Sequence, residues 1–218
     1  MRSSVFLAGP LLSRCGRAEL CAPGGCAIGS RPTDLHVQGL SALSAEISQQ
    51  QGRLLCRAGQ LLGAEVFLSY PSVGATENIL MAAVSAKGET VIRNAAREPE
   101  IVDLQNFLNA CGADIRGAGT EEIRIKGGRR LSPVRYRVMG DRIEGGTYLM
   151  AAAATGGSLR LRGISPQWIA AELSVLRRMG CRIEEGAQEV FLQAPSRLRS
   201  PGEVTAQPWP GFATDLQS

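Results

Sequence analysis

The amino-acid sequence repeats itself at a spacing of about 70 residues, and this repetition constrains its fold more than any other feature. Two blocks, residues 74–127 and 145–193, share one arrangement of glycines and apolar stretches. Their matched positions are Gly74 with Gly145, Gly88 with Gly156 and Gly112 with Gly180. A weaker copy precedes them, in which Ala45 matches Ala113 at the same spacing. The chain therefore holds about three copies of one structural unit.

Each copy has the same order of predicted elements. An Ala-rich apolar stretch predicts a first helix, and a short strand bounded by glycine follows it. A second helix has apolar residues at helical spacing, and two further short strands complete the copy. The predicted elements of the two clearer copies cover residues 79–84, 90–92, 101–108, 113–115 and 123–125, and then 148–154, 158–161, 169–176, 181–183 and 190–192. The repeated unit is therefore αβαββ.

Proline and glycine mark the two ends of the second helix in these copies. Pro99 and Pro166 stand near its expected start, where the N–H that proline lacks has no acceptor within the helix. Gly112 and Gly180 stand near its expected end, where glycine adopts the left-handed conformation that terminates a helix. The same punctuation in both copies supports the repeated order of elements.

Units of this size favour a compact, pseudo-symmetric α/β domain. A solenoid is the alternative, but solenoid repeats usually have roughly 20–45 residues. The Arg-rich segment 127–144 interrupts the repetition and is a candidate hinge. A length of 218 residues suits one large domain or two small ones.

The composition excludes several classes of protein. Apolar residues make up 44% and charged residues 20%, which argues against disorder. No apolar run approaches the roughly 18 residues that span a bilayer, and a net charge of +4 is too small and dispersed for nucleic-acid binding. Of the 24 basic residues 22 are arginine, whose planar fork suits phosphates and carboxylates. A genome rich in arginine codons would give the same count.

Histidine and cysteine usage narrows the chemistry. His36 is the only histidine, which excludes sites with several histidine ligands, and any Ser-His or Cys-His machinery would have to use it. The six cysteines include no CxxC pair, and a chain of this length builds a core without disulfides. The N-terminal stretch resembles a signal peptide only faintly, because Gly9-Pro10 breaks it. We therefore expect a cytoplasmic protein with reduced thiols.

A loop rich in proline and glycine, residues 21–36, departs from the pattern of the other copies. Cys26 lies in its middle and Arg31 follows five residues later, so the thiol is a candidate acid or nucleophile with a lowered pKa. The alternative is a half-buried structural thiol. Asp34 is a candidate N-cap of the helix that follows, and Arg31 could bind an anion near that terminus.

The second copy has a comparable turn at residues 71–76. The Ser72 hydroxyl, the neighbouring backbone N–H groups and the helix N-terminus could together cradle a phosphate. Many helices begin with serine or threonine, so an ordinary helix start is the alternative.

Five runs, in this order along the chain, resemble the UDP-N-acetylglucosamine 1-carboxyvinyltransferase family of bacterial enolpyruvyl transferases: PGGCAIGSRPTDLH, SVGATENILMAA, NAAREPEIVDLQNFLNACGA, GDRIEGGTYLMAAA and PGFATDLQ. The resemblance extends over essentially the whole chain. Shikimate-pathway enolpyruvyl transferases share the fold of this family but lack its cysteine loop.

The resemblance implies an α/β fold, an inside-out α/β barrel whose two domains each contain three αβαββ units. About three units are present, so the chain is similar to a central portion of such an enzyme that lacks both ends, and we expect an incomplete barrel. Residues 1–140 would form two units of the first domain, with the cysteine loop at 21–36. Residues 141–218 would form one unit of the second domain and the start of the next.

The implied reaction transfers the enolpyruvyl group from phosphoenolpyruvate to the 3-hydroxyl of UDP-N-acetylglucosamine and releases phosphate, the first committed step of peptidoglycan synthesis. Cys26 matches the cysteine that protonates the enolpyruvyl carbon and is alkylated by the epoxide fosfomycin. Asp215 matches the aspartate that acts as base at the sugar hydroxyl. The resemblance implies no metal, no organic cofactor and no obligate protein partner; the two substrates are the expected partners.

Substrate-binding residues follow from the same matched runs. Arg2 and Arg31 match substrate arginines. The remaining matches are Pro32, Thr33, Asp34 and Leu35 in the uridine pocket, and Ser72, Val73 and Gly74 in the turn that faces the diphosphate.

Two positions depart from the pattern of the resembled family. Tyr70 stands where a lysine is expected, so the diphosphate site has one cation fewer, and Phe6 stands where a tryptophan is expected. An enolpyruvyl transferase is one hypothesis. The other is a truncated, non-catalytic remnant that binds sugar nucleotide weakly or not at all.

Overall fold

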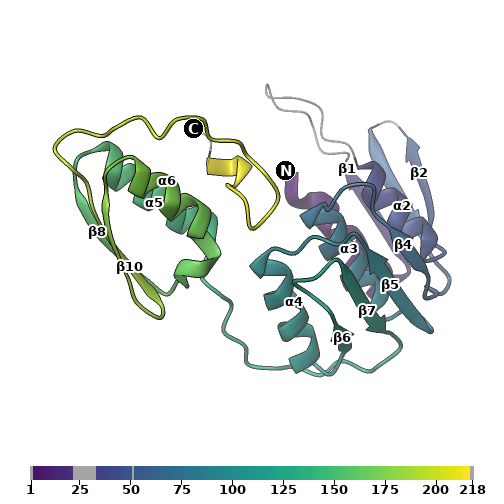
Figure 1. Cartoon of the computed structure of the whole chain (residues 1–218). Coiled ribbons are helices and arrows are strands. Elements are labelled where there is room, and N and C mark those ends of the chain that lie inside the picture. Colours follow the sequence, from purple (N-terminus) through teal and green to yellow (C-terminus); the bar gives the residue numbers. More distant parts are fainter. Residues whose placement is uncertain (1, 22–32, 51, 217–218) are drawn as a thin grey trace. The chain divides into compact units, whose positions relative to one another are not determined.

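Each of the three sequence copies folds as αβαββ, which confirms the predicted unit. The computed structural model describes residues 2–21, 33–50 and 52–216. They form two compact units, Met1–Tyr136 and Arg137–Ser218 (Figure 1). The unit boundary falls within the segment 127–144, which interrupts the repetition in the sequence.

Unit 1 contains two copies. The first consists of a 3-10 helix η1 (Arg2–Leu7), α1 (Ala8–Cys15), β1 (Arg17–Cys21), α2 (Asp34–Ala42), β2 (Glu46–Gln50) and β3 (Arg53–Arg57). A short strand, β4 (Glu65–Phe67), precedes the second copy. That copy consists of α3 (Val73–Ala83), β5 (Glu89–Arg93), α4 (Pro99–Ala110), β6 (Asp114–Arg116) and β7 (Glu122–Lys126).

Unit 2 contains the third copy and a C-terminal segment. Its elements are α5 (Arg142–Ala154), β8 (Ser158–Arg162), a 3-10 helix η2 (Pro166–Ile169), α6 (Ala170–Arg178), β9 (Arg182–Glu185), β10 (Glu189–Gln193) and a 3-10 turn η3 (Thr214–Leu216). The helices α5 and α6 contact each other and lie on one side of the sheet (Figure 1).

The strands of every copy pair in the same order. Within the described residues the sheets are β1-β3-β2, β4-β5-β7-β6 and β8-β10-β9, so the last strand of each copy always lies between the other two. Thr90 pairs with Ile125, and their equivalents in the third copy, Ser158 and Gln193, also pair, so the register repeats with the sequence. These are separate open sheets and not a closed barrel, in agreement with the expected incomplete α/β architecture.

A Schellman motif ends the second helix of every copy. At α4 the Gly112 N–H donates to the Asn109 carbonyl and the Ala113 N–H to the Leu108 carbonyl, with Gly112 at a φ of +108°. Gly180 repeats this arrangement after α6 with a φ of +97°, so both predicted glycine caps are confirmed. In the first copy the equivalent position is Ser44, which takes a φ of +68°.

The core of unit 1 is built around α3. Ile79 and Leu80 are fully buried, and this helix contacts α1, α2, α4 and η1.

The two buried threonines of the second copy, Thr76 and Thr90, differ in the hydrogen bonding of their hydroxyl groups. Thr76 Oγ1 accepts a hydrogen bond of 3.1 Å from the Ala96 N–H, whereas Thr90 Oγ1 has no partner among the described residues. Burial of an unpartnered hydroxyl costs stability.

The core of unit 2 is smaller and separate. Leu149 from α5, Leu173 and Leu176 from α6, and Val190 and Leu192 from β10 pack together. In the described part of the chain, no helix is long and apolar enough to cross a membrane.

We expect Ser44→Gly to stabilise the protein by about 1 kcal/mol, because a left-handed φ strains a serine and not a glycine. Urea unfolding monitored by circular dichroism measures the change. The matched control is Gly112→Ser, which should destabilise by a similar amount. A lower urea midpoint for Ser44→Gly would contradict the assignment of strain.

We expect Thr90→Val to stabilise the protein by about 1 kcal/mol, because it removes an unpartnered buried hydroxyl and keeps the shape of the side chain. Thr76→Val is the matched control and should destabilise by about 1–2 kcal/mol, because it leaves the buried Ala96 N–H without its acceptor. Equal effects of the two substitutions in urea unfolding would disprove the distinction.

Candidate functional site

The predicted diphosphate turn forms the N-terminus of α3. Ser72 is its N-cap: the side-chain oxygen accepts a hydrogen bond of 3.3 Å from the Ala75 N–H, and the carbonyl accepts one of 3.0 Å from the Thr76 N–H. The first N–H groups of a helix have no acceptor within the helix, so Val73 and Gly74 bring amides to a site suited to an anion. Tyr70, at the expected lysine position, is exposed beside this turn.

The described part of the predicted uridine segment, residues 33–35, forms the start of α2. Thr33 is the N-cap; its side chain accepts no capping hydrogen bond, and its carbonyl accepts one of 2.9 Å from the Val37 N–H. Asp34 is the first residue of the helix and is exposed. The prediction that Asp34 caps the helix is therefore wrong. Its carboxylate lies in the first turn, where it interacts favourably with the helix dipole.

His36 joins these two turns. It is buried, with 8% exposure, and its ring lies edge-on to Phe6 with the centroids 5.9 Å apart. A Cβ atom at Gly74 would lie 2.8 Å from the Phe6 ring and 3.3 Å from His36 Cε1, so a side chain there would clash. Glycine at position 74 therefore lets the α3 turn pack directly against the first turn of α2.

Asn78 determines the protonation state of His36. Its Oδ1 accepts from the Gly9 N–H at 2.6 Å, and its Nδ2 donates to the Val5 carbonyl at 3.0 Å. These backbone partners fix the amide orientation, so Nδ2 is also the donor to His36 Nδ1 at 3.0 Å. His36 Nδ1 must therefore be an acceptor, and the ring is neutral with its proton on Nε2. Burial lowers the pKa of His36, which the Asp34 carboxylate partly offsets.

A carboxyl group with a shifted pKa lies next to Asn78 in the sequence. Burial, reinforced by the carboxylates of Glu100 and Glu98, raises the pKa of Glu77 to about 7. Glu98 itself is buried at the start of α4. A carboxyl group with this pKa exchanges its proton near neutral pH, and the sequence pattern of the turn gave no indication of it.

Asp215 lies in unit 2, in the turn η3. Its side chain is exposed, and it contributes to the lining of a cavity of about 620 Å³ together with Met150, Val175 and Phe212. The buried Glu172 of α6 accepts a hydrogen bond of 3.0 Å from the Ala213 N–H, two residues before Asp215.

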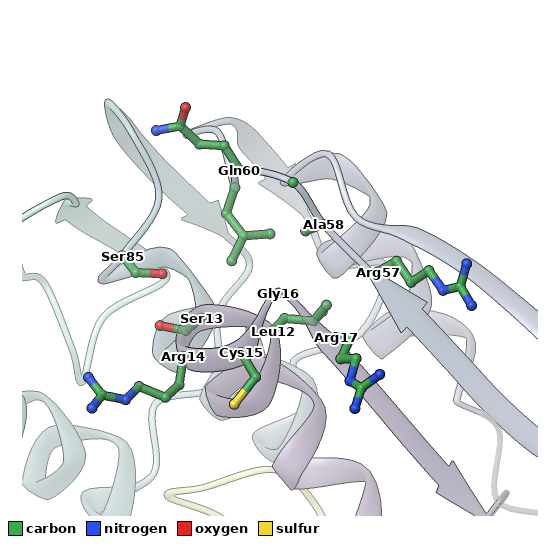
Figure 2. Close-up of a pocket in the computed structure, with 12 residues that line it drawn as sticks. Leu12, Ser13, Arg14, Cys15, Gly16, Arg17, Arg57, Ala58, Gln60 and Ser85 are labelled. Carbon is green, nitrogen blue, oxygen red and sulfur yellow. The ribbon is translucent and has the colours of Figure 1, made fainter.

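A larger cavity, of about 880 Å³, lies at the C-terminal end of α1 and contains none of the predicted site residues. Arg14, Arg17 and Arg57 contribute to its lining. Arg17 and Arg57 are partners across the β1–β3 ladder, and the Arg14 side chain extends away from both (Figure 2). These guanidinium groups do not converge on one point, so this cavity is a poor candidate for a phosphate site.

The remaining predicted site residues are only partly described. Cys26, Arg31 and Pro32 lie outside the described residues, and for Arg2 the backbone alone is described, within η1.

Unit 1 brings the segments 33–35 and 72–74 together through His36. Sequence reasoning singled out His36 but gave it no partner, and it missed Asn78 and Glu172. Among the described residues, no cluster of three or more His, Cys, Asp or Glu side chains could hold a metal ion.

Comparison with known proteins assigns the family. The model of the EPSP synthase family, 3-phosphoshikimate 1-carboxyvinyltransferase, matches residues 1–218, and the chain therefore belongs to this family. UDP-N-acetylglucosamine 1-carboxyvinyltransferase 1 of Symbiobacterium thermophilum is 52% identical over 218 residues, which are 100% of this chain and 49% of that protein. The UDP-N-acetylglucosamine 1-carboxyvinyltransferase of Gloeobacter violaceus is 48% identical, again over the whole chain and over 48% of the relative. These identities confirm the resemblance seen in the sequence.

Solved structures confirm the fold. The enolpyruvyl transferase NikO from Streptomyces tendae superposes with a TM-score of 0.80 at 25% identity, over 100% of this chain and 52% of its own. An EPSP synthase from Acinetobacter baumannii superposes with a TM-score of 0.62 at 22% identity, over 88% of this chain and 46% of its own. The chain thus spans about half the length of the relatives that it matches.

We expect His36 to make the stability of the protein depend on pH. Because its pKa is lowered in the folded state, the unfolded chain binds the proton first, so its stabilising contribution is present above pH 6.5 and is lost as the pH falls below it. The free energy of unfolding should therefore drop more steeply between about pH 7.5 and pH 5.5 in the wild type than in His36→Gln.

Urea unfolding of both proteins at the two pH values measures this difference. The other titratable groups, Glu77 among them, are present in both proteins, so their contributions cancel to first order in the comparison. Parallel pH dependence of the two proteins would show that His36 is not held neutral by Asn78.

Proposed function

We propose that the chain acts in enolpyruvyl transfer from phosphoenolpyruvate to the 3-hydroxyl of UDP-N-acetylglucosamine, with release of phosphate. The observation that carries this proposal is the 48–52% identity, over every residue of the chain, to relatives named for this reaction. The geometry of unit 1 supports it: two helices begin after Thr33 and Ser72, and Gly74 of the second packs against His36 of the first. Helix N-termini of this kind suit a diphosphate.

The reaction requires one acid, one base and cations for the phosphate. In the proposed addition step, Asp215 takes the proton of the sugar 3-hydroxyl while that oxygen attacks C2 of phosphoenolpyruvate, and the Cys26 thiol gives its proton to C3. The product is a tetrahedral ketal that still carries phosphate. In the elimination step a proton leaves C3, the C2–C3 double bond re-forms, and the C2–O bond to phosphate breaks.

The remaining predicted residues bind substrate in this scheme. Arg2 and Arg31 pair with phosphate oxygens, for which the planar guanidinium is suited. Residues 32–35 contact the uridine, and the amides of Val73 and Gly74 bind the diphosphate at the N-terminus of α3. No residue in the scheme requires a metal or an organic cofactor.

The domain assignment and the cellular role belong to the same proposal. Residues 1–140 would be part of a first enolpyruvyl transferase domain and residues 141–218 part of a second. The product would enter peptidoglycan synthesis, so loss of the activity would affect cell shape and division. We place the reaction in the cytoplasm, because six cysteines without a CxxC pair suit a protein with reduced thiols.

A phosphate-release assay tests the reaction. With both substrates present, we expect the protein to release phosphate, and Cys26→Ala and Asp215→Asn to lower the rate at least about 10²-fold through loss of proton transfer. Cys15→Ala is the matched control, because Cys15 is an exposed thiol outside the predicted site. Release that does not require UDP-N-acetylglucosamine, or that persists in Cys26→Ala, would contradict the proposal.

Fosfomycin gives an independent test that does not need turnover. We expect mass spectrometry to find the epoxide attached to Cys26, whereas the exposed thiols of Cys15 and Cys21 stay unmodified. Modification of all three thiols at similar rates would indicate that Cys26 has no special reactivity.

A further inference from the structure

Glu172 is a buried carboxylate on α6 whose role in unit 2 is unexplained by the fold. It has 2% exposure and follows η2 in the first turn of the helix. Buried carboxylates are rare, because desolvation of the charge is costly unless a specific partner repays it. Its partner is the Ala213 N–H, distant in the sequence, at 3.0 Å from Oε1.

Comparison with the preceding copy shows that the second helix of the unit does not need a carboxylate at the position of Glu172. The offset that relates Gly112 to Gly180 also relates Leu104 of α4 to Glu172 of α6. Leu104 is an ordinary apolar residue packed against the core of unit 1. A second helix of this fold therefore accepts leucine at the position, and the carboxylate in unit 2 calls for a separate reason.

The segment that Glu172 binds carries Asp215. Ala206 and Phe212 form an isolated bridge in which the Gln207 N–H donates to the Phe212 carbonyl at 3.0 Å, so this segment folds back on itself. After it, the Leu216 N–H donates to the Ala213 carbonyl at 3.1 Å and closes the η3 turn. The side chain of Leu216 is buried next to Gly146, where a Cβ atom would lie 2.6 Å from Leu216 Cδ1.

Asp215 thus lies between two anchors. On one side, the Ala213 N–H is held by Glu172; on the other, Leu216 is packed against α5 at Gly146. Asp215 between them is exposed and lines the cavity of about 620 Å³. Hydrogen bonds from N–H groups to a charged acceptor are roughly twice as strong as neutral ones, so a carboxylate is a better anchor than a neutral acceptor.

We propose that Glu172 is a positioning residue, which fixes the 211–216 turn and so aims the carboxylate of Asp215 at the sugar hydroxyl. This inference rests on the proposed function, in which Asp215 is the base. A base displaced by about 1 Å costs up to about 10²-fold in rate, so the anchor contributes to turnover more than to substrate binding.

The test compares Glu172→Leu, which introduces the residue that the repeat accepts at this position, with Glu172→Gln, which keeps an oxygen acceptor. Glu184→Leu, a change of an exposed glutamate in the same unit, is the matched control. Hydrogen exchange is measured on peptides that cover residues 206–216, and kcat and KM are measured by phosphate release.

We expect Glu172→Leu to speed exchange of the 211–216 amides at least about 10-fold and to lower kcat about 10- to 100-fold, with KM for the sugar nucleotide changed less than about 3-fold. Glu172→Gln, which keeps a weaker, neutral oxygen acceptor, should change each measurement less than Glu172→Leu does. If Glu172→Leu does not fold, Ala213→Pro removes the donor of the same hydrogen bond and should give the same changes.

Unchanged exchange in Glu172→Leu would overturn the anchor. Faster exchange with unchanged kcat would overturn its role in positioning the base. If the wild-type protein releases no phosphate, the proposed function fails, and exchange alone still decides whether Glu172 holds the turn.

Discussion

The side-chain amide of Asn78 is the contact on which unit 1 depends. It accepts from the Gly9 N–H, donates to the Val5 carbonyl and donates to His36, so one buried residue of α3 joins η1, α1 and α2. All three partners belong to the first copy, whereas Asn78 belongs to the second. The amide also holds His36, against which Gly74 packs, so it contributes to the relative position of the two predicted nucleotide-binding turns.

The copies are alike in fold and differ where they meet other parts of the chain. His36, Leu104 and Glu172 occupy one equivalent position of the second helix in the three copies. The middle residue is apolar and packs against the core, while the outer two are buried polar residues that bind a segment beyond their own copy. A polar residue at this position connects a copy to another part of its unit, and in both cases the connection lies beside a predicted site segment.

Much of the fold was predictable from the sequence, because apolar spacing and glycine caps act locally. The αβαββ order and the ends marked by Gly112 and Gly180 are of this kind. The site was harder to predict from the sequence, because its groups interact over long sequence separations. No local pattern connects His36 to Asn78, or Glu172 to Ala213. The capping role expected of Asp34 failed for a different reason, because the helix begins one residue earlier than that role requires.

The close approach of α1 and α3 makes the two copies of unit 1 inseparable as folding elements. A Cβ atom at Gly9 would lie 2.2 Å from the Asn78 backbone oxygen, so the two helices approach each other closely enough for their backbones to be in contact. Repeats that contact only their neighbours can unfold progressively from their ends. In the described part of unit 1, α1 of the first copy and α3 of the second are in direct backbone contact, so the two copies should melt in a single cooperative step.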